Sequence, residues 1–131
     1  MVRVCVADDD GTIREVVAEF LREEGYEVEA FDGGAALLDR LRTSWEPLIA
    51  LLDLTMPQAG GMAFLVTLAR EPSLSVRHRF LLATPYGWGH EPEVALLLLQ
   101  TGVQMIEKPF TLDVLLEAVG EAAQALADAG V

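Results

Sequence analysis

The sequence predicts a doubly wound α/β fold, a five-stranded parallel sheet with helices on both faces. Short apolar segments alternate along the chain with longer segments whose apolar residues recur every three to four positions, the order expected of parallel strands joined by helices. Three of the short segments are apolar almost without interruption, as strands buried on both faces are. The length of 131 residues fits one such domain.

The first half of the fold begins with an apolar strand at residues 2–7. The helix after it carries one apolar stripe and ends at Gly25, because glycine favours the left-handed conformation that closes helices. Asp10 is placed to cap the start of this helix. Residues 26–30 alternate apolar side chains with glutamate, which is typical of a half-exposed strand at a sheet edge. The apolar stripe of the helix consists of Ile13, Val16, Val17, Phe20 and Leu21.

The second half repeats the pattern. Asp32 could cap a helix that ends before Pro47, and residues 48–52 form a buried strand that stops at Asp53. The remaining elements are expected to be a helix through residues 64–68 preceded by Gly60 and Gly61, a strand at 80–83, a helix at 93–101 ended by Gly102, a strand at 103–106 and a closing helix at 112–126.

Polar residues stand at the carboxyl ends of four strands. Asp8 and Asp9 follow the first strand and Asp53 follows the third. Thr84 follows the fourth strand and Lys108 the fifth. In an open α/β sheet the ligand site lies outside these ends, where the winding reverses. With the strand order 2-1-3-4-5, that point lies between the first and third strands, so Asp53 is central.

The chemistry of these residues indicates a metal-dependent phosphoryl site. Carboxylates that are brought together repel one another unless a cation is bound, and ligation by oxygen alone suits Mg²⁺. A carboxylate nucleophile, a hydroxyl and the only lysine of the chain are the other groups that phosphoryl transfer needs. Each residue alone would be ordinary, since strand-end aspartates often only cap helices. The combination at one edge of the sheet indicates function.

The same residues resemble the response-regulator receiver domains of two-component signalling. The resemblance rests on residues 6–10 (VADDD), residues 51–57 (LLDLTMP) with Gly61, Thr84, and residues 108–110 (KPF). It covers the whole chain in order. It implies a flavodoxin-like fold in which Asp53 is the phospho-acceptor.

The resemblance also implies a metal site. Asp8 and Asp9 would bind Mg²⁺ together with Asp53, and Thr55 would contribute its backbone carbonyl. Mg²⁺ is therefore the expected cofactor. Thr84 would supply the switch hydroxyl.

The region around the lysine combines agreement with departures from the family pattern. Lys108 would pair with the phosphoryl group, and the bond between Lys108 and Pro109 would be cis. The switch position three residues before the lysine, usually aromatic, holds Met105. The segment from Thr84 to Gly102 is longer than usual, and the segment from Gly102 to Lys108 is about one residue shorter. These departures affect how phosphorylation would be transmitted.

The function implied is that of a phospho-acceptor. A sensor histidine kinase would transfer a phosphoryl group to Asp53 in a Mg²⁺-dependent reaction, and the chain would relay it as a change in conformation or association. Such a protein is not an enzyme, because it assists only its own phosphorylation and dephosphorylation. Residues 1–131 are expected to form one receiver domain, with no output domain in this chain.

Two alternatives remain open. Residues 8–12 (DDDGT) also match the opening of haloacid-dehalogenase-type phosphatases, in which Asp8 would be the nucleophile and Asp10 the general acid/base. That family needs a further acidic motif at a strand end after the lysine, and it leaves Asp53 unexplained. The other alternative is a receiver-like binding module that acts without phosphorylation.

Composition excludes some classes of binding partner and indicates where the protein is located. With 21 acidic against 9 basic residues, the net charge of −12 opposes binding to nucleic acid or to anionic membranes. No apolar run reaches the length of a signal peptide or membrane span, so we expect a cytoplasmic protein. Cys5 is expected to be a buried hydrophobe. Residues 77–79 (RHR) are expected to form a solvated turn.

The helix at residues 93–101 carries more leucine than one sheet face can bury. We therefore expect an exposed apolar patch, and a homodimer through this helix, the fifth strand and the closing helix. The alternative is that the segment carrying Tyr86 and Trp88 folds over the leucines.

Overall fold

The computed structural model describes residues 2–53, 58–85 and 87–130, with the side chains of Asp53, Gln58 and Ala59 excepted. Its five parallel strands have the predicted order β2-β1-β3-β4-β5. The strands are β1 (Arg3–Ala7), β2 (Glu27–Phe31), β3 (Leu48–Asp53), β4 (Arg79–Pro85) and β5 (Gln104–Lys108). The helices are α1 (Gly11–Glu23), α2 (Gly34–Thr43), α3 (Gln58–Arg70), α4 (Pro72–Arg77), the 3₁₀ turn η1 (Trp88–His90), α5 (Pro92–Thr101) and α6 (Leu112–Asp128).

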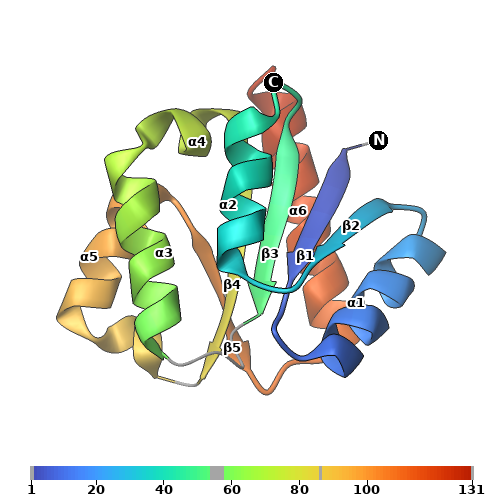
Figure 1. Cartoon of the computed structure of the whole chain (residues 1–131), viewed down its shortest axis with the longest axis horizontal. Helices are drawn as coiled ribbons and strands as arrows, with labels where there is room; N and C mark the ends of the chain where they lie inside the picture. Colours follow the sequence, from blue (N-terminus) through green and yellow to red (C-terminus); the bar gives the residue numbers. More distant parts are fainter. Residues whose placement is uncertain (1, 54–57, 86, 131) are drawn as a thin grey trace.

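Helices cover both faces of the sheet, α1 and α6 on one and α2, α3 and α5 on the other (Figure 1). Successive strand residues point to opposite faces. In β1, Val4 packs with the α1 and α6 core, whereas Cys5 packs with the core beneath α2 and α3. Cys5 is fully buried, as predicted, and burial raises the pKa of its thiol to about 12.

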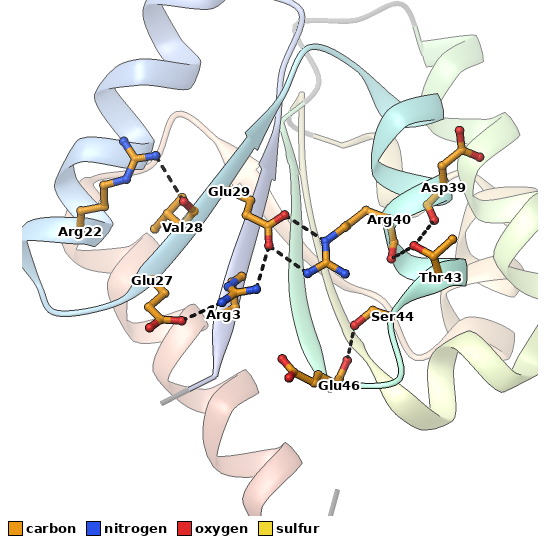
Figure 2. A network of polar contacts seen from close by, with 10 residues as sticks. All are labelled: Arg3, Arg22, Glu27, Val28, Glu29, Asp39, Arg40, Thr43, Ser44 and Glu46. Carbon is orange, nitrogen blue, oxygen red and sulfur yellow. Dashed lines mark hydrogen bonds and ion pairs between the residues drawn. The ribbon is translucent and has the colours of Figure 1, made fainter.

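The edge strand β2 carries a network of ion pairs (Figure 2). The guanidinium of Arg40, on α2, donates two hydrogen bonds to the carboxylate of Glu29, at 2.9 and 3.0 Å. Arg3 bonds both Glu29 and Glu27, at 3.2 and 3.1 Å. These contacts, led by the hydrogen bond from Arg40, lower the pKa of Glu29. The network joins α2 to the edge of the sheet and places charge on an edge that could otherwise pair with another strand.

Of the two predicted helix caps, one is confirmed and the other is wrong. Asp10 caps α1, because its Oδ1 accepts hydrogen bonds from the backbone N–H groups of Thr12 and Ile13. Asp32 does not cap α2, which begins one residue too late for it. Gly33 occupies the N-cap position and makes no side-chain bond there.

The region between β3 and β4 also differs from the prediction. Gly60 and Gly61 lie inside α3 rather than before it, since packing of the apolar face outweighs the roughly 1 kcal/mol that glycine costs in a helix. A short helix, α4, follows at Pro72, a residue that suits the first turn of a helix.

The basic segment at residues 77–79 is not simply a solvated turn. Arg77 is exposed, but His78 beside it is fully buried, and both of its ring nitrogens are hydrogen-bonded to backbone groups. The prediction was wrong because the charge of the two flanking arginines indicated a solvated segment, whereas the histidine between them is part of the core. The last strand also differs, since β5 extends to Lys108 rather than stopping at residue 106.

Candidate functional site

The four strand ends meet at one edge of the sheet. Ala7, the last residue of β1, lies in register with Leu52 of β3, and the next β3 residue, Asp53, lies in register with Ala83 of β4. In turn, Thr84 is paired with Glu107 of β5. The backbones of the predicted site residues are therefore neighbours across the sheet, at its lower edge in Figure 1.

Asp8 is fixed in place by backbone and side-chain bonds. It is fully buried, and its Oδ1 accepts a hydrogen bond of 2.9 Å from the backbone N–H of Asp10. Its own N–H donates to the carbonyl of Phe31, and its carbonyl accepts from Arg14 at 2.7 Å. The bond from Arg14 was not predictable from the sequence, because nothing in the local pattern links a helix arginine to the preceding strand end.

Asp9 differs from Asp8 in being exposed. The pair thus presents one buried and one accessible carboxylate at the end of β1. Both supply oxygen alone, the donor chemistry that hard divalent cations prefer, so the residues present fit Mg²⁺. Within residues 2–53, 58–85 and 87–130, no three acidic, histidine or cysteine side chains are grouped so that they could hold a metal ion. The Asp53 side chain and Thr55, the other expected ligands, lie outside the described residues.

Thr84 is fully buried, and its Oγ1 has no hydrogen-bond partner in the described part of the chain. A buried hydroxyl without a partner costs about 1–3 kcal/mol. In native proteins such a group commonly bonds an ordered water, an ion or a ligand. The hydroxyl is thus available to bond a group that enters the site.

Lys108 ends β5, opposite Pro85 of β4 in the register of the sheet. The peptide bond between Lys108 and Pro109 is cis, as the resemblance implied. The lysine is partly buried rather than fully solvated. The sheet therefore brings its backbone to the same edge as Asp8, Asp53 and Thr84.

The apolar helix α5 shows the predicted surplus of leucine. Val94 is buried, whereas Leu96 and Leu99 are 55% and 84% exposed. Trp88 does not cover them, because its side chain is buried in the core beneath α5. Tyr86 lies outside the described residues. No helix of the described chain is long and apolar enough to cross a membrane.

Comparisons with known proteins agree with this architecture. The model of the response regulator receiver domain family matches residues 4–120. The transcriptional regulatory protein PdtaR of Mycobacterium tuberculosis is 42% identical over 62 residues, which cover 46% of this chain and 29% of PdtaR. The phosphate regulon transcriptional regulatory protein PhoB of Escherichia coli is 35% identical over 111 residues, 83% of this chain and 46% of PhoB. The chain therefore spans less than half the length of these relatives.

A solved structure extends the match to nearly the whole fold. The beryllofluoride-activated NtrC4 receiver domain dimer aligns with a TM-score of 0.72 and 24% identity, over 96% of this chain and 99% of that one. The family model covers far more than half of the sequence, and the strand order is the one predicted. The chain belongs to the response regulator receiver domains of two-component signalling.

Proposed function

We propose that Asp53 accepts a phosphoryl group from the phosphohistidine of a sensor histidine kinase in a Mg²⁺-dependent reaction. The observation that carries the proposal is the convergence of Asp8, Asp53, Thr84 and Lys108 at the carboxyl edge of one parallel sheet. The buried Thr84 hydroxyl adds weight, because it offers a hydrogen bond that the described residues do not use.

The chemistry is an in-line displacement at phosphorus. A carboxylate oxygen of Asp53 forms a bond to phosphorus as the bond to the histidine nitrogen breaks, and the departing imidazole keeps the electron pair and takes up a proton. The Lys108 ammonium and the Thr84 hydroxyl donate hydrogen bonds to the phosphoryl oxygens. Asp8 and Asp9 would hold Mg²⁺, with Asp53 and the Thr55 carbonyl, and the ion would neutralise phosphoryl charge.

Intact-mass measurement tests the proposal. The protein is incubated with Mg²⁺ and acetyl phosphate, a small phosphodonor, and should gain one phosphoryl group. Asp53→Asn should abolish the gain, and Asp8→Asn should reduce it by weakening metal binding. Asp39→Asn, a change of the same kind on the exposed face of α2, is the matched control and should leave it intact.

Other outcomes identify the alternatives. An adduct lost in Asp8→Asn and kept in Asp53→Asn would support the phosphatase mechanism. A folded protein that gains no phosphoryl group under any of these conditions would support a binding module that acts without phosphorylation.

We also infer that phosphorylation strengthens a symmetric dimer through α5, β5 and α6. Leu96 and Leu99 are exposed on α5, and Val114 is 46% exposed on α6. Between β5 and α6 lies a groove of about 630 Å³ that includes Val114 and Phe110. The activated NtrC4 receiver domain, a protein of the same fold, is described as a dimer. Exposed apolar surface of this kind favours association between protein chains.

A further inference from the structure

The segment that follows Thr84 is held by two side chains of β5. The first is Glu107, whose Oε2 accepts a hydrogen bond of 2.8 Å from the backbone N–H of Gly87. Gly87 has φ +85°, a backbone conformation that residues with a side chain rarely adopt. It is the N-cap of the 3₁₀ turn Trp88–His90. A carboxylate acceptor makes this bond stronger than one between neutral groups.

The second side chain is Met105. A Cβ atom added at Gly89 would overlap the terminal methyl group of Met105 and lie 2.8 Å from its sulfur. The absence of a side chain at Gly89 therefore allows the thioether to lie directly against the backbone of the turn. Met105 and Glu107 are two residues apart in β5, so they project from the same face of the strand.

The segment is anchored between these contacts by its aromatic residue. Trp88 is 4% exposed and packs in the same core cluster as Val94 of α5 and Val103. A displacement of residues 87–89 would therefore disturb the packing beneath α5. The turn and the leucine-bearing helix therefore pack into the same core.

Thr84 is close to the same contacts. It lies in register with Glu107, and two residues separate it from Gly87. Its hydroxyl is buried and without a partner in the described chain. Any movement of Thr84 toward a group on Asp53 would pull on a segment that Glu107 and Met105 hold in place.

We propose that Glu107 and Met105 form a latch that holds residues 87–89 in the resting position and opposes the engagement of Thr84 with a phosphoryl group on Asp53. The proposal rests on the proposed function. Glu107 is here a positioning residue, because it acts through the backbone of Gly87. Releasing the latch shifts the equilibrium toward the engaged state by the free energy with which the latch stabilises the resting position.

Binding of beryllofluoride, a phosphoryl mimic, tests the latch by calorimetry in the presence of Mg²⁺. Glu107→Leu removes the acceptor and should lower the apparent dissociation constant roughly tenfold, the effect of one hydrogen bond to a charged group. Glu107→Gln keeps a neutral oxygen acceptor at the same reach, so it should lower the apparent dissociation constant less than Glu107→Leu does. Glu23→Leu, an equal change in charge on α1, which covers the opposite face, should have no effect.

The methionine contact is tested by a pair of substitutions. Gly89→Ala displaces the Met105 side chain and should also tighten beryllofluoride binding. The effect should not add to that of Met105→Ala, because both remove the same contact.

Tryptophan emission reports on the turn itself. In a Trp45→Phe background Trp88 is the remaining tryptophan, so its emission reports on the turn. Thermal unfolding confirms that each variant is folded.

The outcomes separate the two proposals. Unchanged or weakened binding in Glu107→Leu would overturn the latch, as would a Glu107→Gln variant that matches Glu107→Leu. If the parent protein gains no phosphoryl group from acetyl phosphate, the proposed function fails. If the parent is phosphorylated and Glu107→Leu binds beryllofluoride like the parent, only the latch fails.

Discussion

The imidazole Nδ1 of His78 accepts a hydrogen bond of 3.0 Å from the backbone N–H of Leu48, the first residue of β3. The other ring nitrogen, Nε2, lies 3.0 Å from the carbonyl oxygen of Leu41. A carbonyl can only accept, so Nε2 carries the proton and the neutral ring satisfies both backbone groups. Burial is the main cause that lowers the pKa of His78, with Arg77 and Arg40 adding to it, while the Leu41 carbonyl opposes it.

This contact predicts a loss of stability in mild acid. The folded protein favours neutral His78, because a proton on Nδ1 would face the Leu48 N–H. The stabilising contribution is therefore complete above the ordinary pKa of 6.5 and is lost as the pH falls below it toward the lowered pKa of the folded state. Urea unfolding between about pH 5 and pH 8 measures how steeply the free energy of unfolding changes with pH, which is the slope expected from His78.

Two variants locate the slope at His78. His78→Phe should lower the free energy of unfolding near neutral pH by about 2 kcal/mol or more, because it leaves two buried backbone groups unpaired, and should flatten the slope. His90→Gln, at an exposed site, should keep the slope. Glu29 does not interfere, since its lowered pKa acts below its ordinary value of 4.5. An unchanged slope in His78→Phe would contradict the assignment.

Replacement of glycine by alanine should have opposite effects on stability at two positions. Gly102 closes α5 with φ +71°, so Gly102→Ala should destabilise the protein by about 1 kcal/mol. Gly120 lies inside α6, where an added Cβ meets nothing within 4 Å, so Gly120→Ala should stabilise it by about 0.5–1 kcal/mol. Chemical unfolding of both variants is the measurement. The same sign for both would contradict the backbone geometry.

Mg²⁺ is expected to stabilise the unphosphorylated protein. At a concentration about tenfold above its dissociation constant, an ion that binds only the folded state adds about 1.4 kcal/mol. This corresponds to a rise of about 4 °C or more in the melting temperature for a domain of this size. Asp9→Asn should reduce the rise, and Asp39→Asn should not. A folded protein with no Mg²⁺-dependent shift would contradict the metal site.

The leucines of α5 predict weaker association when one is charged. Leu99 is 84% exposed, so Leu99→Glu should leave the fold stable and weaken the dimer of the phosphorylated protein. Val76→Glu, at a 71% exposed position on α4, is the matched control and should not affect association. Light scattering of both forms provides the test. A phosphorylated protein that is monomeric at every concentration would contradict a dimer through this face.

The sequence was sufficient for the order of the strands and for the edge of the sheet where polar residues gather. Continuous apolar runs identify buried strands such as β3, and strand ends follow from the polar residue after each run. Helix starts were less predictable. Asp10 and Asp32 look alike as caps, but only Asp10 stands next to the first residue of its helix.

Contacts between distant residues could not be predicted. Neither the Glu107 bond to Gly87 nor the burial of His78 between two arginines has a local signature, because both depend on packing across the sheet. The same holds for the contacts of the candidate site. Spacing indicated that Asp8 would lie at the strand end, but its carbonyl bond to Arg14 follows from the three-dimensional path of α1.

Identification of the modified residue shows whether Asp53 carries the phosphoryl group. Borohydride reduces an aspartyl phosphate to homoserine, which peptide mass spectrometry can place in the sequence. After treatment with acetyl phosphate and Mg²⁺, we expect homoserine at position 53 and unmodified aspartate at Asp8, Asp9 and Asp10. Homoserine at position 8 with intact Asp53 would show that Asp8, and not Asp53, is the acceptor.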